Sequence, residues 1–138
     1  MRTVLAIGVL LTVGAGAAYA GQLGEPLPHV SQGRCPTLHA QRLPSDALAG
    51  ARNAALDQAR AVYRGTNLKG MRATRVVRAT HDRERGGYAR VKCGRRMQER
   101  TVVVYLAFPA MRPSASLSQG VVLVSRFSGQ YRVWAQLH

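Results

Sequence analysis

Residues 101–108 read Thr-Val-Val-Val-Tyr-Leu-Ala-Phe, and they are the most apolar of the strands that this sequence predicts. The run is short, rich in β-branched and aromatic residues, and ended by a proline, which favours a central strand. Downstream, residues 121–127 and 131–137 flank Ser-Gly-Gln, which predicts a hairpin. Upstream, residues 71–80 are rich in Ala, Thr and Val and predict a further strand.

Residues 88–93 (Tyr-Ala-Arg-Val-Lys-Cys) alternate between apolar and polar side chains, and this period of two predicts one more strand. Its outer face would carry Tyr88, Arg90 and Lys92. The flanking segments, 81–87 and 94–100, are polar, and we expect a turn in the first and a basic hairpin connection in the second. The sheet should therefore contain four to five antiparallel strands.

A helix is expected before the strands, between Ser45 as N-cap and Gly65 just past the last turn. Apolar residues recur there at helical spacing: Leu48, Ala51, Ala55, Ala59 and Val62. Because the stripe is mostly alanine, the helix can lie close against a sheet. At 100° per residue Arg52 falls about 40° from Leu48, inside the stripe. We interpret Arg52 as a side chain that reaches water from the edge of the stripe, the alternative being a cation in a pocket beside the helix.

One helix followed by four or five antiparallel strands predicts an α+β fold for residues 45–138. This order resembles the cystatin-like roll, shared by nuclear-transport-factor-like domains, in which a curved sheet wraps around one N-terminal helix. The Gln-x-Val-x-Gly hairpin of inhibitory cystatins is absent, since residues 119–122 read Gln-Gly-Val-Val, and Val133-Trp134 falls in mid-strand. The resemblance therefore implies the fold and not protease inhibition. The closing segment is also similar to small secreted proteins of GC-rich bacteria, a likeness that implies no activity.

The N-terminus has the features of a secretory signal peptide spanning residues 1–20. A basic start precedes the apolar run 4–17, and Ala-Tyr-Ala then matches a cleavage site. The run is shorter than the roughly 20 residues that span a bilayer. We therefore expect a secreted chain, extracellular or periplasmic, with no transmembrane segment after cleavage and an extended lead segment at 21–44.

Cys35 and Cys93 are the only two cysteines of the chain. An oxidising compartment favours joining them, which would fix the lead segment to the strand region. They lack the Cys-x-x-Cys spacing of a redox or metal site, so we expect a structural disulfide.

The chain carries 20 Lys and Arg against 6 Asp and Glu, a formal net charge of +14. With 46% hydrophobic residues it is too apolar for a disordered basic tail. A sheet face with arginine beside aromatics can bind phosphate backbones and stack bases, whereas the alternative is a solvated polar face. The candidate anion-binding residues are Arg72, Arg75, Arg78, Arg90, Lys92, Arg95, Arg96, Arg100, Arg126, Arg132 and Trp134. The partner would be a nucleic acid, a cell-wall polymer or an acidic polysaccharide.

Catalytic and metal-binding patterns are missing from the sequence. His29, His39, His81 and His138 lack metal-ligand spacing, and there is no Gly-x-Ser-x-Gly elbow. We therefore expect a non-catalytic binding or structural module with no metal and no cofactor. Two alternatives stay open. One is a microbial-type ribonuclease using Glu99, Arg100 and His138, and the other is an inhibitor-like partner of another secreted protein. No motif identifies a protein partner.

Overall fold

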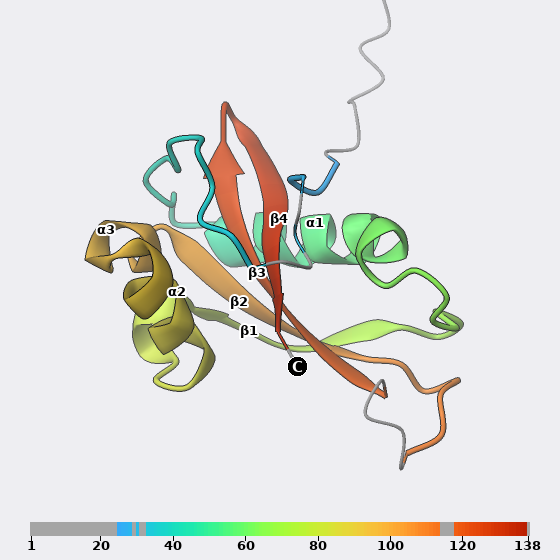
Figure 1. The fold of residues 1–138 in the computed structure, drawn as a ribbon. Helices are drawn as coiled ribbons and strands as arrows, with labels where there is room; N and C mark the ends of the chain where they lie inside the picture. Colours follow the sequence, from blue (N-terminus) through green and yellow to red (C-terminus); the bar gives the residue numbers. More distant parts are fainter. Residues whose placement is uncertain (1–24, 29, 31–32, 114–117, 138) are drawn as a thin grey trace, which may run out of the picture.

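The computed structural model describes residues 25–28, 30, 33–113 and 118–137. Figure 1 shows the fold. The elements are α1 (Ala47–Val62), β1 (Arg72–Arg78), the 3₁₀ turn η2 (Ala79–His81), α2 (Arg85–Cys93), α3 (Arg95–Gln98), β2 (Thr101–Ala107), β3 (Gln119–Phe127) and β4 (Gln130–Leu137). No helix in this part of the chain has the length and apolar character needed to cross a membrane. The predicted signal peptide lies outside the described residues.

The four strands form one antiparallel sheet in the order β1-β2-β3-β4, with α1 packed against it. This confirms the predicted α+β class. Strand β2 is central, as expected, because Val103 pairs with Val77 on one side and with Leu123 on the other. The β3–β4 hairpin is also confirmed, although β3 begins at Gln119, two residues earlier than predicted.

Both faces of the sheet are covered, which explains the continuous apolar character of β2. Val102 and Val104 pack in the core under α1. Val103 faces the opposite way, into a second core that includes Ala89 of α2 and Leu27 of the lead segment. Figure 1 shows α1 behind the sheet and the α2–α3 pair to one side of it.

Helix α1 lies close to the sheet because small residues line its buried face. Ala47, Ala51, Ala55 and Ala59 are almost fully buried. Gln58 also points inward, where its amide donates to the Tyr131 carbonyl at 2.9 Å and its carbonyl accepts from the Val133 amide at 2.8 Å. Gln58 thus provides hydrogen-bond partners for two backbone groups of β4, which is an edge strand of the sheet.

Two expectations about α1 need correction, and a third agrees with the structure. The helix begins after Asp46 rather than Ser45, and no side chain caps it. Leu48 is exposed, because the buried face starts at Ala47 and not at the predicted Leu48. Arg52 is exposed to solvent, in agreement with a side chain that reaches water.

The strand predicted at 88–93 is wrong, since these residues belong to helix α2. The expected hairpin connection at 94–100 is also wrong, because it contains helix α3. The physical reason is the way α2 packs. Its buried residues, Gly86 and Ala89, are three positions apart, whereas Val91, assigned to the apolar face of the strand, is 85% exposed. At Gly86 a Cβ would come within 1.9 Å of the Ala79 carbonyl oxygen, so glycine permits this close approach to η2.

The lead segment runs along the molecule without joining the sheet as a strand. The Leu27 amide donates to the Val133 carbonyl at 2.8 Å, and the Gln41 amide donates to the Arg126 carbonyl at 2.7 Å. Between these points the predicted disulfide is confirmed: Cys35 is bonded to Cys93 at the end of α2, with the two Cα atoms 5.5 Å apart. The disulfide therefore fixes α2 and the lead segment to each other.

Candidate anion-binding surface

Three of the arginines predicted to bind anions instead hold the lead segment through its carbonyl groups. Arg78 donates to the Pro44 carbonyl at 2.8 Å, and Arg100 donates to the Ala40 carbonyl. Arg132 donates from Nε to the Glu25 carbonyl at 2.7 Å and from Nη2 to the Pro26 carbonyl at 3.4 Å. These carbonyls lie outside the strands, so the guanidinium groups supply donors that a sheet ladder would otherwise provide, although Pro44 also accepts from the Ala47 amide at 3.3 Å.

Two further candidate arginines are also used within the fold. Arg75 lies 3.6 Å from the Asp82 carboxylate and 5.2 Å from the centre of the Tyr105 ring. Arg126 donates to the Gly129 carbonyl at 3.3 Å and so braces the β3–β4 turn. Both guanidinium groups therefore already have partners within the protein.

Trp134 cannot stack on a nucleic-acid base, because it is only 1% exposed and its indole donates to the Ser125 hydroxyl at 3.1 Å. The predicted outer sheet face of arginines and aromatics is therefore wrong. The second face of the sheet is covered by α2 and the lead segment, which turns the expected outer residue Trp134 into a core residue. Tyr88 is occupied as well, since its hydroxyl donates to the Gly33 carbonyl at 3.0 Å.

Four of the five remaining candidates, Arg90, Lys92, Arg95 and Arg96, lie on the two short helices, which were predicted as a strand and a hairpin connection. We define the α2–α3 basic surface as five exposed side chains on these helices and the loop before them: Arg83, Arg90, Lys92, Arg95 and Arg96. The two acids of this segment are already paired. Glu84 lies 3.3 Å from Arg85, and Glu99 lies 2.9 Å from Arg95. Arg72 is exposed too, but it lies at the other end of β1, opposite Ala107.

A cavity of about 420 Å³ opens on this surface between η2, α2 and α3. Arg83, Arg90 and Arg95 line it together with Glu99, which is paired with Arg95. Asp82 also reaches it, yet that carboxylate is buried and accepts hydrogen bonds from Tyr105 and from the Arg85 amide. Because Arg95 is already paired with Glu99, Arg83 and Arg90 are the guanidinium groups through which this opening can receive a phosphate, sulfate or carboxylate group.

The residues of the ribonuclease alternative have other partners. The Glu99 carboxylate accepts from Arg95 at 2.9 Å, and Arg100 donates to the Ala40 carbonyl. His138, the third member, lies outside the described residues, as does His29. Within the described ranges no group of three or more His, Cys, Asp and Glu side chains is placed to hold a metal ion.

Comparison with known proteins gave no match to a family model, to a curated protein or to a solved structure. The resemblance to the cystatin-like roll therefore stays a prediction. Any functional conclusion depends on the geometry of the chain itself.

Proposed function

We propose that this protein is a non-catalytic module that binds an extracellular anionic polymer through the α2–α3 basic surface. The observation that carries the proposal is the contrast between two sets of arginines. One set holds the lead segment by its carbonyls, as Arg78 and Arg132 do. The other set, which includes Arg90 and Arg96, is exposed on a part of the fold that the disulfide fixes in place.

A fixed cationic surface favours polymer binding because little side-chain and backbone order has to be created on association. Helix α2 is tied to the lead segment by Cys93 and to the sheet by Ala89, and Met97 of α3 packs against the same core. Successive anionic groups of a chain could then contact several guanidinium groups at once. The resulting affinity would depend strongly on salt, since each neutralised anionic group releases a counterion.

Among the anionic partners considered, a polymer recognised by charge alone is favoured. The aromatic residue expected to stack bases, Trp134, is buried, and the Tyr88 hydroxyl is engaged by Gly33. Stacking platforms are what give single-stranded nucleic acids much of their binding energy. A cell-wall polymer or an acidic polysaccharide is therefore the preferred class. The predicted signal peptide and the disulfide support an extracytoplasmic location for such a partner.

The experiment compares two triple variants that remove the same charge from different places. One carries Arg90→Gln, Lys92→Gln and Arg96→Gln on the α2–α3 basic surface. The control carries Arg52→Gln, Arg60→Gln and Arg64→Gln, which are exposed on and just after α1. Binding to heparin and to double-stranded DNA is measured from about 50 to 200 mM salt.

We expect the first triple variant to lose at least tenfold in heparin affinity at low salt and to show a shallower salt dependence. The control should retain nearly the affinity of the wild type. Equal losses in both variants would mean that binding reports net charge alone, and the proposal would be wrong. Absence of wild-type binding at low salt would overturn it as well.

A further inference from the structure

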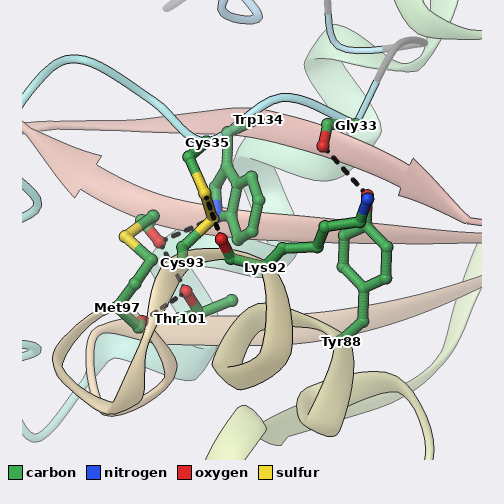
Figure 2. The surroundings of a disulfide bond; sticks show 9 residues. Gly33, Cys35, Tyr88, Lys92, Cys93, Met97, Thr101 and Trp134 are labelled. Carbon is green, nitrogen blue, oxygen red and sulfur yellow. Dashed lines mark hydrogen bonds between the residues drawn. A yellow bond between two sulfur atoms is a disulfide. The ribbon is translucent and has the colours of Figure 1, made fainter.

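A second cavity, of about 520 Å³, lies beside the disulfide and shares no lining residue with the α2–α3 basic surface. The lead segment forms its wall through Cys35, Pro36 and Leu38, and the sheet contributes Trp134 and Arg132. Figure 2 shows the indole of Trp134 next to the Cys35–Cys93 bond. The volume of this cavity falls in the range of about 300–1,000 Å³ that is typical of small-molecule sites.

The cavity has an apolar interior. Leu27 and Trp134 form a buried base, and Pro36 and Leu38 contribute the side walls. Leu38 is 45% exposed, whereas Leu43 of the same lead segment is buried. An exposed leucine at the opening of an apolar cavity offers contact area to a ligand with an apolar body.

Two guanidinium groups, from Arg34 and Arg132, meet this apolar surface, and none of the residues that line the cavity is acidic. Arg132 is fixed in position by the Glu25 and Pro26 carbonyls. Those contacts are made by Nε and Nη2, while a guanidinium has five N–H donors, so Arg132 keeps donors for a further acceptor. Arg34 is exposed and adds a second cation at the rim.

We propose that this cavity binds a small amphipathic organic anion: one carboxylate carried on an aryl or acyl body. The carboxylate would pair with Arg34 and Arg132, and the body would lie against Pro36 and Leu38. This combination of an apolar interior with a few convergent polar groups is the usual form of a ligand site. The proposal does not depend on polymer binding, because the two sites share no residue.

Trp134 provides the measurement, because it is the single tryptophan of the chain and lines the cavity. Tryptophan emission is recorded while octanoate and phenylacetate are added to the disulfide-bonded protein. Their neutral counterparts, octanol and phenylethanol, test the charge requirement. We expect a saturable change in emission with the carboxylates and at least tenfold weaker binding of the alcohols, as loss of a charge-assisted contact implies.

Matched variants locate the site. Arg34→Gln should weaken carboxylate binding about tenfold and leave alcohol binding unchanged, whereas Leu38→Asn should weaken both. The controls are Arg52→Gln and Leu48→Asn, which alter an exposed arginine and an exposed leucine of α1 and should change neither. The proposal fails if carboxylate and alcohol bind alike, if no saturable change occurs, or if the two controls weaken binding as much as the two site variants.

Discussion

The hydroxyl of Tyr105 donates a 2.6 Å hydrogen bond to the carboxylate of Asp82, which joins the central strand to the start of α2. The other carboxylate oxygen accepts from the Arg85 amide at 2.8 Å. Burial by itself would raise the pKa of Asp82. The hydrogen bonds from Tyr105 and from the Arg85 and Gly86 amides, together with the charge of Arg75, outweigh burial and hold the pKa below its ordinary value of 3.8. Burial and the same carboxylate raise the pKa of Tyr105 to about 12, so this tyrosine remains a donor at neutral pH.

Asp82 should therefore make the stability of the fold depend on pH. A carboxyl whose pKa is lower in the folded state stabilises the fold above its unfolded pKa, and this stabilisation is lost as pH falls through the folded pKa. At pH 7 we expect Asp82→Asn to lower the free energy of unfolding by about 1–3 kcal/mol. The difference from wild type should shrink as the pH falls below about 4. Urea unfolding at several pH values measures this, with Asp57→Asn, an exposed change on α1, as the control. A constant difference across the pH range would contradict the assignment.

The two adjacent glycines of α2 should respond in opposite ways to a methyl group. A Cβ at Gly86 would come within 1.9 Å of the Ala79 carbonyl oxygen, whereas a Cβ at Gly87 would meet nothing within 4 Å. Gly86→Ala should therefore destabilise the protein by about 1–3 kcal/mol through overpacking. Gly87→Ala should be neutral or stabilise it by up to about 1 kcal/mol, because alanine favours the helix. Thermal unfolding of both variants decides the matter, and equal effects would mean that α2 does not pack on η2 in this way.

The strands of the sheet could be predicted from sequence because their apolar runs are long enough to stand out, as residues 101–108 do. Helix α2 could not be predicted from its apolar residues. In nine residues it buries little besides Gly86 and Ala89, so a period of two fits its pattern as well as a period of three or four. The one sequence feature that could have indicated this helix is Asp82. Its carboxylate lies three positions before Arg85 and accepts a hydrogen bond from the Arg85 amide at the start of the helix.

The candidate anion site was predicted only in part, because the sequence does not show what covers the second sheet face. With that face assumed open, Trp134 and Arg132 were expected on the surface. Helix α2 and the overlying lead segment instead bury Trp134. The carbonyl partners of Arg132 also lie more than 100 residues away along the chain, where no local pattern can indicate them. Arg90 and Lys92 are exposed, as predicted, although they lie on a helix and not on a strand.

The arginines that bind carbonyls should matter for stability and not for polymer binding. Arg78→Gln removes a 2.8 Å charged hydrogen bond to Pro44 and leaves that carbonyl without this donor. We expect a loss of about 1 kcal/mol or more, since hydrogen bonds to charged groups contribute about 1.5–3 kcal/mol and this arginine is partly solvated. Arg90→Gln, on the exposed face of α2, is the matched control and should change stability little. Denaturant midpoints and heparin affinity are measured for both variants. A heparin defect in Arg78→Gln without a stability defect would reverse the two roles.

The Cys35–Cys93 bond should contribute strongly to stability, because it fixes the lead segment to α2 where Cys93 packs against the second core. The two cysteines are 58 positions apart, and the chain-entropy model gives about 4 kcal/mol for closing a loop of that length. The double variant Cys35→Ser with Cys93→Ser should therefore unfold at much lower denaturant concentration than wild type. Wild type in a reducing agent gives the same comparison without substitution. Trp134 emission reports the local effect in either case, because its indole lines the cavity that the disulfide borders. The double variant and the reduced wild type could instead both unfold at the midpoint of the disulfide-bonded protein. The carbonyl contacts of Arg78, Arg100 and Arg132 would then suffice to hold the lead segment, and the disulfide would not be needed for its attachment.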